Sequence, residues 1–237
     1  MMRAGGGEAV VFPPTLFILF LRSLKMKSVV ILISGRGSNL LALLEAQLPG
    51  RITAVISNRP EATGLELARS HGVAAVSLDH RRYPSREEFD LALAAEVDRQ
   101  GADLVVLAGF MRILGDAFVR RYSGRLLNIH PSLLPVFPGL DTHARALAAG
   151  VKIHGASVHF VTPALDSGPI VIQAAVPVFG HDDEQTLAAR VLAQEHRIYP
   201  QAVRWFLEGR LELTATGRVV LRDEGEASAS LIAPALG

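Results

Sequence analysis

The chain has 237 residues, of which 49% are hydrophobic and 20% are charged, and its 24 basic and 23 acidic side chains leave a net charge of +1. This length suits one globular domain with a full core, and the near-neutral charge gives no electrostatic reason to expect nucleic acid or an anionic membrane as partner. The absence of cysteine excludes disulfides and thiolate metal sites, and it suits a cytoplasmic protein.

The first 25 residues differ from the rest of the chain. Their stretch AVVFPPTLFILFL is apolar, but two prolines interrupt it and it is too short to span a bilayer. It also lacks the clear basic start and the small-residue cleavage site of a signal peptide. We therefore interpret residues 1–25 as an atypical extension without function, residues 26–223 as a single domain, and residues 224–237 as a poorly ordered tail.

Short runs rich in Val, Ile and Leu alternate with amphipathic helical patterns in the first half of the domain. The runs lie at 29–34, 52–57, 74–78, 104–109 and 126–130, and the helical patterns lie at 38–48, 61–72, 85–100 and 114–122. Alternation of this kind, with continuously apolar strands, predicts an α/β protein. Its sheet would be open, twisted and mostly parallel, with helices on both faces, as in Rossmann-like folds.

The pattern changes in the second half. Two apolar runs at 154–162 and 169–178 lie close together around ALDSG, which predicts antiparallel strands toward the C-terminal part. A long amphipathic helix is expected over 182–209, and Pro200 within it predicts a bend or an interruption.

The loop SGRGSN at 34–39 follows the first strand and opens the first helix. Gly35 and Gly37 allow a tight turn, Ser38 is a suitable N-cap, and free amides at a helix start bind phosphate or another anion. The third glycine of the dinucleotide fingerprint is absent, so a mononucleotide-sized phosphate fits better. A plain tight turn is an equal alternative for this loop taken alone.

Asn128 and His130 end the fifth strand, just before a loop that contains Pro131, Pro135 and Pro138. Two residues apart on an extended strand, they share one face of the sheet. An amide can donate to a developing oxyanion and an imidazole can carry a proton near neutral pH, which predicts a catalytic site. Polar capping of a strand end is the alternative.

Several other residues are candidates for the same site. Asp166, in VTPALDSGP, would orient His130 and favour its protonated form if the two lie close, although Asp-Ser-Gly by itself is typical of a turn. Met111 and Arg112 follow the fourth strand, where arginine can hold an anion and methionine suits a core equally well. Three histidines of the second half lack the spacing of a metal site, and no metal is expected; these are His143, His154 and His159.

Five segments, in this order, resemble the phosphoribosylglycinamide formyltransferase family: LISGRGSNL, VLAGFMRIL, LLNIHPSLLPVFPGLDTH, HGASVHFVTPALDSGPIVIQ and QEHRIYP. The resemblance covers about residues 27–223, and its most specific part is NIHPSLLP with Asp166 following 36 residues after His130. It implies the Rossmann-like formyltransferase fold. The implied reaction transfers a formyl group from 10-formyltetrahydrofolate, as co-substrate, to the amino group of 5′-phosphoribosylglycinamide in purine biosynthesis, without a metal or a covalent enzyme intermediate.

The resemblance also implies roles for single residues. Asn128 would stabilise the oxyanion, His130 would carry the proton, and Asp166 would support His130. The ribonucleotide-binding residues implied are Gly37, Ser38, Asn39, Leu192, Ala193, Gln194 and Glu195. The folate-binding residues implied are Arg86, Met111, Arg112, Ile113, Leu114, Asn128, Thr162, Pro163, Ala164, Leu165 and Asp166.

Two positions depart from the family pattern. Asp141 stands where histidine is common, and we assign it no role. Leu192 stands where Gln or Lys is common, which argues against a side-chain contact there and leaves a backbone contact open.

Other functions fit parts of the pattern. A formyltetrahydrofolate hydrolase would pass the formyl group to water, but such enzymes usually carry an N-terminal regulatory domain, for which 25 residues are too few. Methionyl-tRNA formyltransferases normally add a C-terminal RNA-binding domain. A catalytically silent nucleotide-binding protein would keep only the phosphate loop. A nicotinamide-dependent dehydrogenase is disfavoured, because the dinucleotide-binding fingerprint is incomplete. We expect two small-molecule substrates as partners, no nucleic acid or membrane, and a monomer or homodimer.

Overall fold

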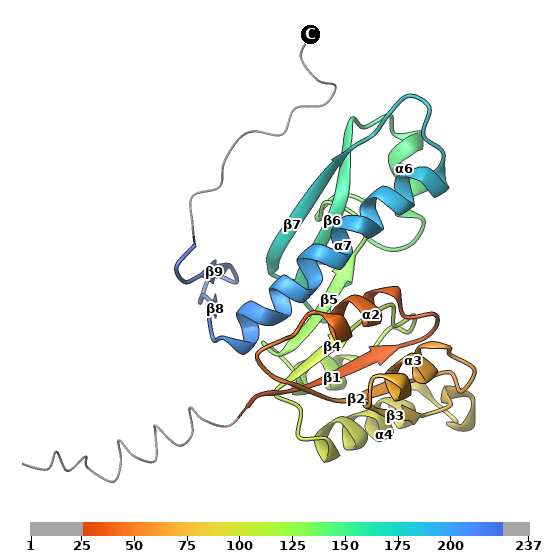
Figure 1. Cartoon of the computed structure of the whole chain (residues 1–237), viewed down its shortest axis with the longest axis vertical. Coiled ribbons are helices and arrows are strands. Elements are labelled where there is room, and N and C mark those ends of the chain that lie inside the picture. Colours follow the sequence, from red (N-terminus) through yellow and green to blue (C-terminus); the bar gives the residue numbers. More distant parts are fainter. Residues whose placement is uncertain (1–25, 225–237) are drawn as a thin grey trace, which may run out of the picture.

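The computed structural model describes residues 26–224, so the predicted extension at 1–25 and residues 225–237 of the predicted tail lie outside the described residues. A seven-stranded sheet forms the centre of the described part (Figure 1). Its strands are β1 (Ser28–Ile33), β2 (Arg51–Ser57), β3 (Ala74–Ser77), β4 (Leu104–Leu107), β5 (Leu126–His130), β6 (Ile153–Phe160) and β7 (Ile170–Pro177). Their order is β3-β2-β1-β4-β5-β6-β7. Strands β1 to β5 are parallel and the β5–β6 and β6–β7 pairs are antiparallel, which confirms the predicted α/β fold class.

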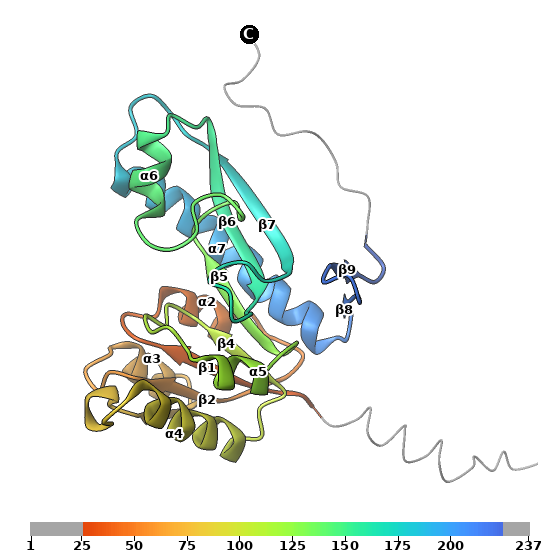
Figure 2. The same cartoon turned by 180° about the vertical axis from the view of Figure 1, so that it is seen from behind.

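Helices cover both faces of this sheet. They are α2 (Ser38–Glu45), α3 (Gly64–Ser70), α4 (Arg86–Arg99), α5 (Asp116–Arg121), α6 (Thr142–Ala148) and α7 (Glu184–Leu207), with a short 3-10 turn η1 (His80–Arg82). Helices α2, α3 and α7 pack on the face seen in Figure 1, and α4 and α5 pack on the face seen in Figure 2. Helix α6 and the hairpin of β8 (Leu211–Leu213) and β9 (Val219–Leu221) were not predicted.

Strand β1 shows why the sheet is covered on both sides. Val29, Ile31 and Ile33 pack into the core beneath α2 and α7, whereas Val30 and Leu32 pack into the core beneath α4 and α5. Successive side chains of a strand point to opposite faces, so a continuously apolar strand fits only between two layers. Each of these buried side chains contributes roughly 1.5–3 kcal/mol to folding.

Helix α7 runs without a break from Glu184 to Leu207, so of the predicted bend or interruption at Pro200 the interruption is wrong. Tertiary contacts on both sides of the proline hold the helix together. Leu187 and Val191 are buried before it, and Tyr199, adjacent to it, donates from Oη to the carbonyl oxygens of Leu107 (2.8 Å) and Leu127 (3.2 Å). This packing outweighs the one backbone hydrogen bond that proline removes.

The beginning and the end of the domain meet at the amino-terminal edge of the sheet. Lys27 Nζ donates to the carbonyl oxygen of Phe206, near the end of α7, at 3.0 Å, and the ammonium group lies 5.4 Å from the centre of the Phe206 ring. Within residues 26–224, no helix has the length and apolar character needed to cross a membrane.

Candidate active site

The strand order reverses between β1 and β4, because the chain runs from β1 outward to β2 and β3 and then returns to β4 on the other side. The two loops that leave this point are tied together. Ser34 N donates to the carbonyl oxygen of Gly109 (3.1 Å), and Met111 N donates to Ser34 Oγ (2.8 Å). Ligands of open α/β sheets bind at such a reversal, outside the carboxyl ends of the strands.

Strand β5 carries Asn128 and His130, and the antiparallel strand β6 adds a neighbour to each. In the β5–β6 register His159 lies opposite Asn128 and Ser157 lies opposite His130. Directly opposite residues of two strands project on the same face, so the four side chains form one polar patch. Within it, Asn128 Nδ2 lies 3.3 Å from His159 Nε2.

Asp166 reaches the same patch from the loop between β6 and β7. Its Oδ2 atom lies 3.4 Å from His130 Nδ1, and its Oδ1 atom lies 3.8 Å from His159 Nε2. Gly139 N donates to Asp166 Oδ2 at 2.9 Å. The structure therefore brings the predicted catalytic residues Asn128, His130 and Asp166 together.

His130 is held at both ring nitrogens. Nε2 lies 2.9 Å from the carbonyl oxygen of Phe137, which can only accept a hydrogen bond, and Nδ1 faces the Asp166 carboxylate. A ring that carries both protons can donate to both partners, whereas a neutral ring donates to one of them. Only 6% of His130 is exposed, so these two contacts determine the orientation of the ring.

The proline-containing loop after β5 is held by a buried polar network. Ser157 Oγ donates to the carbonyl oxygen of Ser132 (2.7 Å) and accepts from Leu134 N (3.0 Å). Gln173 Nε2, on β7, donates to Ser157 Oγ (2.8 Å) and to the carbonyl oxygen of Leu134 (3.0 Å). Side chains of two strands thus hold the loop that contacts His130 and Asp166.

The loop after β1 forms the entrance to a second part of the site. Gly37 has φ 83°, a left-handed conformation that favours glycine, and precedes the first turn of α2. A hollow of about 260 Å³ opens there, lined by Arg36, Gly37, Ser38, Leu41, Leu67 and Leu192. The first amides of a helix have no partner within the helix, so they are available to an anion in this hollow.

Asn39 and Glu195 lie deeper than the rest of the predicted ribonucleotide site. Both are buried, and Asn39 Nδ2 donates to Glu195 Oε2 at 2.7 Å, so the Asn39 side chain faces α7. Burial raises the pKa of the Glu195 carboxyl above its usual value. Ala193 is exposed beside them, and Gln194 Oε1 accepts from Arg197 at 2.8 Å.

The predicted folate residues occupy loops and one helix start. Met111 and Ile113 are 65% and 66% exposed, whereas Arg112 and Leu114 are half-buried. Arg86 begins α4, and its exposed side chain lies 3.7 Å from Glu87 Oε1. Thr162, Pro163, Ala164 and Leu165 form the loop before Asp166, with Leu165 exposed. Exposed apolar side chains on these loops suit a flat aromatic ligand.

The sequence analysis missed three partners of the catalytic residues: His159, Phe137 and Gly139. His159 was considered only as a metal ligand. Its position opposite Asn128 depends on the β5–β6 register, and the spacing of the sequence does not show that register. No group of three or more His, Asp or Glu placed to hold a metal ion occurs within residues 26–224.

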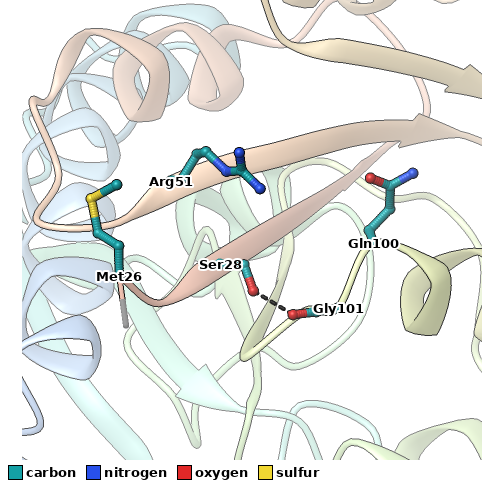
Figure 3. Close-up of a pocket in the computed structure, with 5 residues that line it drawn as sticks. All are labelled: Met26, Ser28, Arg51, Gln100 and Gly101. Carbon is teal, nitrogen blue, oxygen red and sulfur yellow. Dashed lines mark hydrogen bonds between the residues drawn. The ribbon is translucent and has the colours of Figure 1, made fainter. Parts of the chain in front are cut away.

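A larger hollow, of about 330 Å³, lies at the opposite edge of the sheet (Figure 3). It is lined by Met26, Ser28, Arg51, Gln100 and Gly101, and Ser28 Oγ donates to the carbonyl oxygen of Gly101. It lies at the amino ends of β1 and β2, away from the crevice where ligands of such sheets bind. We therefore place the candidate site at the carboxyl edge.

The chain is similar to known proteins of one family. The sequence model that describes the formyl transferase family matches residues 26–203. Phosphoribosylglycinamide formyltransferase of Escherichia coli is 53% identical over 190 residues, which cover 78% of this chain and 90% of that protein. The human protein named trifunctional purine biosynthetic protein adenosine-3 is 42% identical over 199 residues, or 82% of this chain and 20% of that longer protein.

Solved structures give the same result. The crystal structure of glycinamide ribonucleotide transformylase 1 from Symbiobacterium toebii matches with a TM-score of 0.81 and 50% identity, covering 84% of this chain and 95% of that one. The phosphoribosylglycinamide formyltransferase of Coxiella burnetii matches with a TM-score of 0.80 and 48% identity, covering 83% and 94%.

Proposed function

This chain belongs to the formyl transferase family, and from that premise we propose how its site acts. The enzyme transfers the formyl group of 10-formyltetrahydrofolate to the amino group of 5′-phosphoribosylglycinamide, giving formylglycinamide ribonucleotide and tetrahydrofolate in de novo purine biosynthesis. The observation that supports these residue roles best is the contact of His130 with Asp166, with Asn128 on the same strand face, beside a loop suited to phosphate.

The reaction needs an oxyanion donor and a proton carrier. The amine nitrogen attacks the formyl carbon, a C–N bond forms, and the formyl oxygen gains negative charge. Asn128 Nδ2 donates a hydrogen bond to this oxygen, because an amide donor fixed before the reaction stabilises the charge as it develops. The bond from carbon to N10 of the folate then breaks, the amine has lost one proton, and N10 gains one.

His130 and Asp166 handle the proton in this proposal. With Nε2 bonded to Phe137 and Nδ1 beside Asp166, the ring is oriented before the substrates arrive. A proton leaves the amine and reaches N10 by way of His130, either directly or through one water molecule. The Asp166 carboxylate stabilises the positive charge that His130 carries during the transfer.

The ribonucleotide lies along the crevice between α2 and α7. Its phosphate accepts from the backbone amides that follow Gly37, and Ser38 lies at the same helix start. Its ribose or glycinamide part reaches Glu195, with Leu192, Ala193 and Gln194 along the same stretch of α7. The folate lies against 111–114, 162–166 and Arg86. Holding both substrates in one cleft supplies much of the acceleration.

The deciding experiment is an absorbance assay of 10-formyltetrahydrofolate deformylation by the purified protein, with and without glycinamide ribonucleotide. We expect turnover only when the ribonucleotide is present. Turnover without it identifies a formyltetrahydrofolate hydrolase. Ribonucleotide binding without turnover identifies a catalytically silent binding protein.

Location and assembly belong to the same proposal. We assign the enzyme to the cytoplasm, because a phosphorylated substrate does not cross a membrane unaided. A monomer or a homodimer is expected, and the mass of the protein in solution, measured by light scattering, decides between them.

A further inference from the structure

His159 is a buried imidazole to which the proposed reaction assigns no step. It is 2% exposed and stands on β6 directly opposite Asn128. Its Nδ1 atom lies 3.0 Å from the carbonyl oxygen of Phe160, and its Nε2 atom lies 3.3 Å from Asn128 Nδ2. Both ring nitrogens therefore have a partner from a defined direction.

These partners determine which nitrogen carries the proton. The Phe160 carbonyl can only accept, so Nδ1 donates to it and carries the hydrogen. Burial lowers the pKa of His159 below its usual value, although the Asp166 carboxylate 3.8 Å from Nε2 acts in the opposite direction, and this lowering favours the neutral ring, whose Nε2 has no proton when Nδ1 carries it. Nε2 is then an acceptor, and Asn128 must present its NH₂ group to it.

The orientation of the Asn128 amide follows from this tautomer. With one N–H donated to His159, the second N–H projects from the same nitrogen and is available to the formyl oxygen. If Nε2 carried a proton, the amide would turn its oxygen toward the ring, and that oxygen would repel the developing oxyanion nearby.

We infer that His159 is a positioning residue, whose Nδ1-protonated ring fixes the Asn128 amide with its NH₂ group toward the formyl oxygen. This inference rests on the proposed function. It concerns orientation alone, since His159 touches neither substrate in the reaction described above. The Phe160 carbonyl is the fixed reference, because it belongs to the backbone of β6.

The test is a double-mutant cycle on kcat. Asn128→Ala is expected to lower kcat about 100-fold, the usual effect of removing one oxyanion donor. His159→Leu is expected to lower kcat about tenfold in the parent protein, with both KM values within about twofold. In the Asn128→Ala background the same substitution should change kcat less than about twofold, because no amide is left to orient.

Two further variants separate positioning from general damage. His159→Gln keeps an acceptor and is expected to recover most of the lost kcat. Tyr122→Phe removes the buried hydroxyl that donates to the Ala94 carbonyl (3.0 Å) and to Asp98 (2.9 Å); it should lower Tm and leave kcat within about twofold.

Each outcome bears on one proposal. If the double mutant shows a loss of kcat equal to the product of the losses caused by His159→Leu and Asn128→Ala alone, the inference is overturned. An NMR spectrum of the ring that shows the proton of His159 on Nε2 would overturn it as well. If Asn128→Ala leaves kcat unchanged, the proposed oxyanion role of Asn128 fails first, and the positioning role fails with it.

Discussion

His130, which we propose as the proton carrier, has contacts that differ from those of a polar cap at a strand end. A cap needs one hydrogen bond, whereas His130 is held at Nε2 by the Phe137 carbonyl and at Nδ1 by Asp166. Asp166 lies in a loop far from β5 in the sequence. Phe137 lies in the loop directly after β5, which bends back onto that strand. Holding a side chain so firmly costs conformational entropy, and the benefit of a reactive orientation offsets this cost.

We expect His130→Ala to lower kcat about a thousandfold, since positioned acid–base groups contribute roughly this much. The KM for the ribonucleotide should change less than about threefold, because the phosphate loop and Glu195 lie outside the substituted contacts. Steady-state kinetics and calorimetric titration with the ribonucleotide measure the two effects. Undiminished turnover would remove His130 from the mechanism.

Glu195 joins binding to stability in one side chain. Its buried carboxyl accepts from Asn39, and burial raises its pKa, so the folded protein binds this proton more tightly than the unfolded chain does. As pH rises from the unfolded value through the folded value, the free energy of unfolding therefore falls. The charged form of this carboxyl is therefore less favourable in the folded protein than in the unfolded chain.

Glu195→Gln should consequently gain stability relative to the parent as the pH rises, and should bind the ribonucleotide about tenfold more weakly. Urea unfolding across a range of pH and the KM for the ribonucleotide test the two effects. Glu45→Gln, at the exposed end of α2, is the control and should alter neither. A stability difference that does not grow with pH would contradict this account of the buried carboxyl.

At the scale of elements, the loop from 131 to 141 connects the two catalytic side chains. The Phe137 carbonyl accepts from His130, and the Gly139 amide donates to Asp166. Arg145, on α6, holds this stretch from outside: its Nη1 donates to the carbonyl oxygens of Pro138 and Leu140, and its guanidinium lies 5.5 Å from the centre of the Phe137 ring. The loop therefore depends on a helix that follows it.

Arg145→Gln should lower kcat about threefold to tenfold with little change in the KM for the ribonucleotide, because small displacements of a reacting group reduce the rate more than binding. Arg99→Gln removes an exposed arginine of α4 that pairs with Glu96, and it should leave kcat unchanged. Equal kcat values for the two variants would show that Arg145 does not hold the loop.

Residue patterns predicted the elements that have strong periodicity. All five parallel strands, the antiparallel pair and the helices between them are where apolar spacing placed them, within a few residues. Helix α7 was misjudged at Pro200 because the Tyr199 contacts with β4 and β5 are tertiary. Helix α6 and the β8–β9 hairpin are short, and their apolar patterns are too brief to stand out.

The sequence predicted the site residues that belong to local motifs. It missed the residues whose place in the site depends on the register between β5 and β6. Asn128 and His130 were predicted from their place at a strand end, the resemblance gave them and Asp166 specific roles, and the proximity of the three is a property of the fold. His159 and Gly139 contact them only because β6 pairs with β5 and because the proline loop folds back. Glu195 was predicted, but its hydrogen bond with Asn39 joins two helices far apart in the chain.

For the whole molecule, buried histidines set the response to acid. His154 is 1% exposed, its Nε2 has no partner, and burial lowers its pKa to about 4. Between pH 6.5 and 4 the unfolded chain therefore takes up a proton that the folded protein does not. We expect this residue to lower the free energy of unfolding by about 3 kcal/mol, with most of the loss inside this window.

His154→Leu should flatten this dependence, because the variant has no proton to take up at that position. Urea unfolding of both proteins at intervals between pH 4 and 7 gives the two curves. Their difference should grow as the pH falls, whatever the stability of the variant at pH 7. Parallel curves would show that His154 does not contribute to acid unfolding.

The contact of Lys27 with Phe206 has a consequence for how this domain combines with others. It holds the first strand against the end of the last long helix, on the edge of the sheet opposite the catalytic loops. The start of β1 and the end of α7 thus both lie on the side of the sheet away from the candidate site. A domain built this way can serve as a module in a longer multifunctional chain, as the match to one fifth of the human protein illustrates. The carboxyl edge, which carries the candidate site, is left clear of both segments.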